Sequence, residues 1–134
     1  MKIISFGWTW PALVNGAKSV TRRGWDPRYA AMFHAGEVVY AFDRSPRFRG
    51  HPIAKIRLTA DPVLELDSLA PDGDYEAEGF AFFAEHPELL PKAAREQARV
   101  TLSREAFDQW RKGGGKSWVI RFEIVEVYGK EEQP

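Results

Sequence analysis

Four reactive side chains lie close together near the start of the chain: Lys18, Thr21, Arg22 and Arg23. Burial lowers the pKa of a lysine amine, which allows it to act as a base. A threonine hydroxyl becomes nucleophilic when a neighbouring base takes its proton. Arginine side chains bind phosphate or carboxylate groups through paired hydrogen bonds. The segment therefore holds the residue types of a nucleophilic active site and those of an anion-binding site.

The spacing of Lys18 and Thr21 restricts how they can cooperate. On a straight strand, residues an odd number of positions apart point to opposite faces. Cooperation between the two side chains therefore requires a turn or bulge. Gly16, at the end of an expected short helix, makes such a turn available. The alternative is an exposed strand lysine beside a threonine that serves only β-structure.

Glu78 is the candidate acid. It shares a helical face with Tyr75 and Phe82, at spacings of three and four. A carboxylate beside an apolar stripe loses hydration, which raises its pKa and suits proton donation. Glu76 has similar apolar neighbours, so periodicity does not choose between the two. The alternative for either residue is a solvated helix glutamate.

Basic and aromatic residues near this segment are candidates for binding a substrate or a nucleic acid. An arginine can hold a phosphate while an indole stacks on a base. The loop from Arg44 to Arg49 adds further arginines around Phe48. The alternative is an ordinary basic surface with the tryptophans in the core. The candidates are Arg22, Arg23, Trp8, Trp25, Arg44 and Arg47.

Length and composition predict one globular domain. The chain has 134 residues, of which 44% are apolar and 28% are charged, and this suits one modest hydrophobic core. We expect a domain over residues 1–128 and a polar tail over residues 129–134. The first residues form too short an apolar run for a signal peptide. No run approaches the roughly 18 apolar residues of a membrane helix, so we expect no membrane contact.

The chain contains no cysteine, which excludes disulfides and thiolate metal sites and fits a reducing, cytoplasmic location. Its three histidines, His34, His51 and His86, are scattered without the spacing of metal ligands. We therefore expect no metal and no cofactor. The oligomeric state is left open.

The net charge of zero hides a separation of charge along the chain. Residues 18–57 contain nine Lys or Arg and three acids, whereas residues 61–108 contain twelve acids and four bases. Such asymmetry is typical of a surface that faces a polyanion. Pairing between the two halves explains it equally well. Overall neutrality argues against strong nonspecific binding of nucleic acid.

The elements that must position these residues predict an α+β domain. Strands are expected at both ends and in the middle of the chain, with helices grouped between them, and residues 62–69 are expected to form an irregular crossover. The expected strands are residues 2–6, 37–43, 53–58 and 116–128. The expected helices are residues 11–14, 27–35, 75–86, 91–99 and 103–112, with Asp74 and Ser103 capping the third and the last. The expected strands over residues 53–58 and 116–128 could close a small twisted barrel.

The chain resembles the ASCH domain family, a branch of the PUA-like superfamily. The resemblance rests on the run from Leu13 to Arg23, on Ala35-Gly36-Glu37-Val38-Val39, on residues 53–59 and on the Glu78-Gly79-Phe80 step. It covers residues 2–128 and implies a small β-barrel of five or six strands with peripheral helices. The chain departs from the smaller members through residues 27–35 and an insertion over residues 82–111.

The ASCH resemblance implies a ligand that is a modified nucleoside or RNA. One branch consists of small bacterial N4-acetylcytidine amidohydrolases that use a Lys, a Thr and a Glu. Matched residue by residue, these fall on Lys18, Thr21 and Glu78, and the closing Arg of the motif falls on Arg23. The resemblance thus implies hydrolysis of an N4-acylated cytidine. A noncatalytic RNA-binding module and a single-stranded RNA nuclease are the alternatives.

Overall fold

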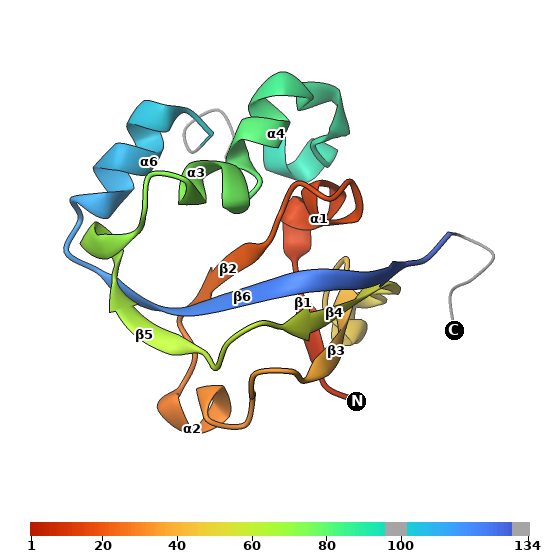
Figure 1. The fold of residues 1–134 in the computed structure, drawn as a ribbon. Coiled ribbons are helices and arrows are strands. Elements are labelled where there is room, and N and C mark those ends of the chain that lie inside the picture. Colours follow the sequence, from red (N-terminus) through yellow and green to blue (C-terminus); the bar gives the residue numbers. More distant parts are fainter. Residues whose placement is uncertain (96–101, 130–134) are drawn as a thin grey trace.

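The computed structural model describes residues 1–95 and 102–129, and within these residues six strands form one mixed sheet. The sheet curls into a half-barrel with helices outside it, which confirms the expected α+β fold (Figure 1). Its order is β1-β3-β4-β6-β2, and β5 also pairs with β6. Only β1 and β3 pair in parallel in this part of the chain. The strands are β1 Ile3–Ser5, β2 Val20–Arg23, β3 Val38–Phe42, β4 Pro52–Leu58, β5 Val63–Leu66 and β6 Lys116–Val127.

Strand β6 organises the sheet because it is long enough to pair with three partners. Its first half lies between β2 and β5, and its second half pairs with β4. Ile120 and Phe122 are buried, as alternation along the strand predicts. Val125 and Val127, on the other face of the strand, are 43% and 41% exposed. No described element covers that end of the strand closely enough to bury them.

The helices are short and gather mainly on one side of the molecule. Helices α3, α4 and α6 lie together above β2, whereas α2 lies on the opposite side of the sheet (Figure 1). Ser103 caps α6 by accepting a hydrogen bond from the Ala106 amide, as expected. None of the described helices is long and apolar enough to cross a membrane. The helices are α1 Trp10–Val14, α2 Pro27–Ala30, α3 Asp74–Ala77, α4 Phe80–Glu85 and α6 Arg104–Arg111.

Helix α1 joins two apolar clusters. Leu13 packs into the main core with residues of β3, β4 and β6. Ala12, one position earlier, packs under the helical layer with Phe83 and Leu90. Both side chains are fully buried. The short helix α1 therefore fixes the α3–α4 layer against the sheet. The segment that follows α1 is held at the junction of that layer and the sheet.

Several expected elements differ in the structure. Residues 63–66 form strand β5 rather than an irregular crossover, because their backbone groups pair with residues 116–119 of β6. The expected helix over residues 27–35 ends at Ala30. Of the expected helix over residues 91–99, Lys92–Ala94 form a 3-10 turn and Arg95 is helical. Residues 96–101 lie outside the described part, as do residues 130–134 of the expected tail.

The expected helix over residues 75–86 is two helices, α3 and α4, separated at Gly79. This glycine has a φ of +94°, a left-handed conformation that ends α3 and turns the chain. Asp74 was expected to cap the helix, but it is the first residue of α3 and Gly73 occupies the cap position. The Asp74 carboxylate instead binds two arginines from the sheet, which takes it away from the helix amides.

Candidate active site

Lys18 lies in a connection held from both sides. The Ala17 amide donates to the Ala12 carbonyl of α1, and the Ser19 amide donates to the Ala77 carbonyl of α3, each over 2.8 Å. Strand β2 begins only at Val20. Lys18 and Ser19 therefore lie outside the regular strand, so the alternation rule does not fix the side of β2 on which the Lys18 side chain lies.

Gly79 allows α3 to approach this connection closely. A Cβ atom at this position would lie 2.7 Å from the Ala12 Cβ and 3.6 Å from the Lys18 Cβ. Real Cβ atoms do not approach to 2.7 Å, so only glycine fits without a shift of the backbone. The Glu78-Gly79 step thus places the last turn of α3 directly against the lysine.

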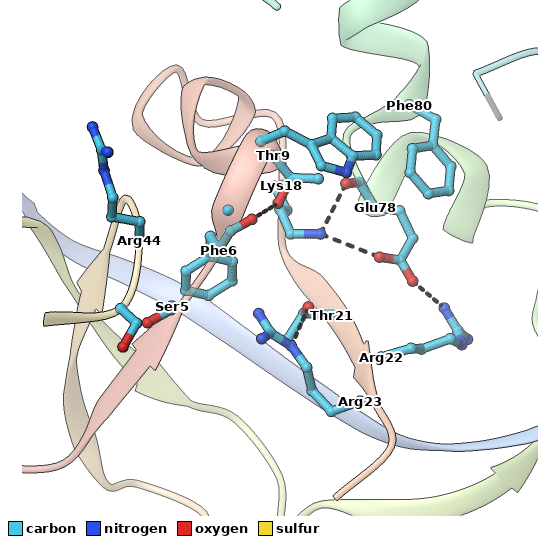
Figure 2. A pocket seen from close by; sticks show the side chains of 13 residues that line it. Ser5, Phe6, Thr9, Lys18, Thr21, Arg22, Arg23, Arg44, Glu78 and Phe80 are labelled. Carbon is cyan, nitrogen blue, oxygen red and sulfur yellow. Dashed lines mark hydrogen bonds and ion pairs between the residues drawn. The ribbon is translucent and has the colours of Figure 1, made fainter. Parts of the chain in front are cut away.

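Lys18 and Glu78 form a buried ion pair. The Lys18 amine donates to the Glu78 backbone carbonyl over 2.9 Å and to Glu78 Oε1 over 3.1 Å (Figure 2). The two residues are only 3% and 7% exposed. Glu78 therefore fixes the amine through its main chain and its side chain together.

Burial lowers the pKa of the Lys18 amine below its ordinary value. The charge and the hydrogen bond of Glu78 act in the opposite direction, and the nearby charges of Arg23 and Arg22 lower the pKa further. The balance favours loss of the proton relative to a lysine in water. This is the electrostatic setting that a lysine base requires.

Arg22 points away from solvent and into a group of carboxylates. Its Nη1 atom donates to Glu78 Oε2 over 2.8 Å, and its Nη2 atom donates to Asp74. Arg121 of β6 also donates to Asp74, through two hydrogen bonds of 3.0 and 2.8 Å. Burial raises the pKa of Asp74, but the bonds from Arg121 and Arg22 outweigh this effect and hold it below the usual range.

Thr21 and Arg23 lie on the same face of β2, two positions apart. Arg23 Nε donates to Thr21 Oγ1 over 3.1 Å (Figure 2), and its guanidinium lies over the Phe6 ring, 5.2 Å from the centroid. Thr21 is 5% exposed. Among the residues that the structure describes, no hydrogen bond joins Thr21 to Lys18 or to Glu78.

These side chains line one open cavity of about 450 Å³. In Figure 2, Ser5 and Arg44 lie on one side of it, and Glu78 and Phe80 lie on the other. The Trp8 and Phe80 rings are stacked, 6.3 Å between centroids, and give the second side an aromatic wall. A volume of this size suits a small organic ligand. The predicted site residues that line the cavity are Trp8, Lys18, Thr21, Arg22, Arg23, Arg44 and Glu78.

Two predicted binding residues do not line this cavity. Trp25 packs its ring against Phe33 at 4.6 Å and against Tyr29 at 5.0 Å, beside the main core. Arg47 is exposed in the turn that follows β3. The tryptophan therefore takes the packing role that the sequence left open for it.

The sequence prediction missed Asp74 and Arg121 as parts of the site. One signal for Asp74 was available, because it lies four residues before Glu78 and such residues share a helical face. No signal identified Arg121, which reaches Asp74 only because β6 pairs with β2. Within residues 1–95 and 102–129, no cluster of three or more histidine, aspartate or glutamate residues could hold a metal ion.

No protein-family model matches the sequence, and no curated protein matches it. Among solved structures, the chain is similar to protein EF3133 from Enterococcus faecalis, of the family described as DUF984, with 19% identity and a TM-score of 0.53 over 91% of this chain and 72% of that one. It is also similar to the structure of ASCH from Zymomonas mobilis, with 14% identity and a TM-score of 0.47 over 97% and 73% of the two chains.

The similarity to EF3133 is a similarity of fold, because the sequence identity is low. The described residues have the same general build that the sequence resemblance implied, a curled mixed sheet with helices outside it. The chain therefore shares the fold of the EF3133 structure, and this fold is the α+β architecture expected of an ASCH domain.

Proposed function

We propose that this protein is an amidohydrolase that removes the acyl group from N4-acylated cytidine-type substrates. One observation carries the proposal: a buried lysine of lowered pKa shares a cavity with a threonine hydroxyl and with the carboxylate that pairs with it. The ASCH resemblance supplies the class of substrate. The aromatic wall of Trp8 and Phe80 offers a surface on which a pyrimidine ring can stack.

In the proposed reaction, Lys18 takes the proton of the Thr21 hydroxyl while Oγ1 forms a bond to the acyl carbon. The proton passes along the Lys18–Glu78 hydrogen bond and reaches N4 from the Glu78 carboxyl as the C–N bond breaks. Lys18 then takes a proton from water as the water oxygen attacks the acyl carbon, and returns it to Thr21 Oγ1 as the ester C–O bond breaks and the carboxylic acid leaves. The Lys18–Thr21 contact is expected to form when substrate binds, since catalytic hydrogen bonds are often long in free enzymes.

Arg23 fits the role of oxyanion donor. Its Nε atom lies 3.1 Å from Thr21 Oγ1, so its N–H groups lie beside the position of the attacked carbonyl. A cationic donor at this place stabilises the negative charge that develops on the carbonyl oxygen. The Phe6 ring beneath the guanidinium holds it in position.

The test is hydrolysis of a panel of N4-acylated cytidines, followed by chromatography of cytidine and acid. We expect wild-type protein and Thr21→Ser to release cytidine, and Thr21→Val to lose roughly 10³-fold or more in kcat with little change in binding. Valine keeps the volume and β-branching of threonine, so lost activity reports the hydroxyl. Full activity of Thr21→Val would exclude Thr21 as nucleophile and leave direct attack by water.

A second candidate function, RNA binding without catalysis, is favoured by the loop after β3. In the described residues, the guanidinium groups of Arg44, Arg47 and Arg49 have no ion pair. Phe48 between them is 68% exposed. Unpaired cations around an exposed ring suit phosphates and a stacked base.

The two functions are separated by one further measurement. If the protein hydrolyses no acylated nucleoside but binds single-stranded RNA with an affinity that falls steeply with salt, the second function replaces the first. Arg47→Gln should then weaken binding, whereas Arg28→Gln, an exposed arginine on α2, serves as the matched control.

A further inference from the structure

We infer that Arg22 is a positioning residue, anchored on Asp74, that holds the Glu78 carboxylate in place and divides its charge between two cations. This inference rests on the proposed function, and it replaces the role in substrate binding predicted for Arg22 from the sequence. The chain of contacts runs Lys18–Glu78–Arg22–Asp74–Arg121 and alternates in charge at each step.

The surroundings of Arg22 leave it unsuited to bind an anionic substrate. Its side chain is 6% exposed, and both terminal nitrogens are engaged by carboxylates. A third carboxylate, Glu65 Oε1, lies 3.9 Å from Nη2, and the Trp110 ring of α6 covers the guanidinium at 5.5 Å. A phosphate approaching this group would meet three negative charges, which disfavours its binding.

The geometry gives Arg22 control over Glu78. One carboxylate oxygen of Glu78 accepts from Lys18, and the other accepts from Arg22 over 2.8 Å. The fork of Arg22 spans Glu78 and Asp74, and Asp74 is held in turn by Arg121 of the neighbouring strand β6. A planar guanidinium held at both ends fixes the orientation of the carboxylate it binds.

The charge of Arg22 also acts on Lys18. The charged groups that face Lys18 are Glu78 from the end of α3 and Arg22 and Arg23 from β2. Glu76 and Glu85 line a second cavity, of about 530 Å³, that Lys18 borders on its other side. Helix α1 contributes no titratable residue. Among the described residues, removal of Arg22 leaves Lys18 as the one cation bonded to Glu78, so Lys18 should hold its proton more tightly.

The test measures the titration of Lys18 directly, by NMR of the lysine side-chain amine in wild type, Arg22→Gln and Arg22→Lys. We expect Arg22→Gln to raise the pKa of Lys18 by about one unit, and Arg22→Lys, which keeps the charge, to bring it back toward the wild-type value. The matched control is Arg57→Gln, which breaks an exposed ion pair with Glu123 on β4 and β6 and should leave the titration unchanged.

Kinetics provide the second readout. The rise of kcat with pH that reports loss of the Lys18 proton should move to higher pH in Arg22→Gln. At pH values below this rise, kcat should fall about tenfold for each unit by which the pKa of Lys18 increases. Arg22→Lys should keep the pH of this rise but lose roughly tenfold in kcat, because an ammonium cannot span both carboxylates. In both variants KM should change little.

An increase in KM with an unchanged pH dependence of kcat and an unchanged Lys18 titration would overturn the inference and return Arg22 to substrate binding. If Arg22→Gln does not fold, as judged by circular dichroism, the kcat and KM of Arg22→Lys decide. If wild-type protein hydrolyses no acylated nucleoside, the proposed function fails, but the NMR titration still tests whether Arg22 sets the state of the Lys18–Glu78 pair.

Discussion

Substitution of Gly79 by alanine should disrupt both the fold and the site. The new Cβ would lie 2.7 Å from the Ala12 Cβ, and the Ala12 side chain is fully buried against Phe83. The backbone at Gly79 has a φ of +94°, a conformation that alanine rarely adopts. Relief of the clash would move the end of α3 away from α1, and Glu78 would move with it away from Lys18.

The magnitude follows from two separate costs. A left-handed conformation costs a residue with a Cβ about 1–2 kcal/mol, and insertion of an extra carbon into a packed region typically costs about 1–3 kcal/mol. We therefore expect the free energy of unfolding to fall by roughly 2–5 kcal/mol. Because the Glu78 carbonyl accepts a hydrogen bond from the Lys18 amine, the proposed hydrolytic activity should fall as well.

Urea denaturation followed by tryptophan fluorescence measures this loss. The matched control is Gly73→Ala, because Gly73 precedes the same helix, has a φ of −66°, and would bring an added Cβ atom no neighbour within 4 Å. We expect this control to be neutral or slightly stabilising. A Gly79→Ala protein as stable as wild type would refute the reasoning that close contact with α1 requires glycine.

Three further predictions concern charged residues. The folded protein lowers the pKa of Lys18 below its ordinary value of 10.5. Between the lowered pKa and about 10.5, the unfolded chain therefore binds more protons than the folded protein, and the free energy of unfolding should rise with pH. Lys18→Met should remove this rise in urea denaturation measured at increasing pH. Asp74→Asn should lower stability at neutral pH by about 2–3 kcal/mol, since two arginines lose a buried partner, and the difference from wild type should shrink as pH falls below 3.8 through the lowered pKa of Asp74. Arg44→Gln should raise KM about tenfold with kcat and thermal stability unchanged, because Arg44 borders the cavity without an ion pair in the described residues; an unchanged KM would remove Arg44 from the binding surface.

The sequence alone predicted those features that depend on local pattern. Alternation of apolar residues identified β6 and β4, because one face of each strand is buried. Ser103 was recognisable as a helix cap because a serine hydroxyl satisfies the free amides of the first turn. The ASCH resemblance gathered Lys18, Thr21 and Glu78 into one hypothesis, and all three border the same cavity.

Contacts between distant segments were beyond the reach of local pattern. Strand β5 was missed because a strand is predicted from its buried face, and none of residues 63–66 is buried. Pairing with β6 makes these residues a strand. The break at Gly79 was missed because a glycine inside a helical pattern is tolerated in isolation. Only the contact with Ala12, far away in sequence, explains why the chain turns there.

Arg22 and Arg23 show most clearly which features the sequence predicts and which only the tertiary structure decides. Alternation along a strand is enough to predict that Arg22 and Arg23 leave β2 on opposite sides. It does not say that Arg22 meets Asp74 and Glu78 while Arg23 meets Thr21 and Phe6. Most of these partners come from α3 and from the residue that follows β1, so only the tertiary structure brings them close to the arginines. The sequence thus determined which chemical groups are present. Tertiary packing decided which of them bind one another and which line the cavity, because a hydrogen bond or a close ion pair forms only when the fold brings its two groups into contact.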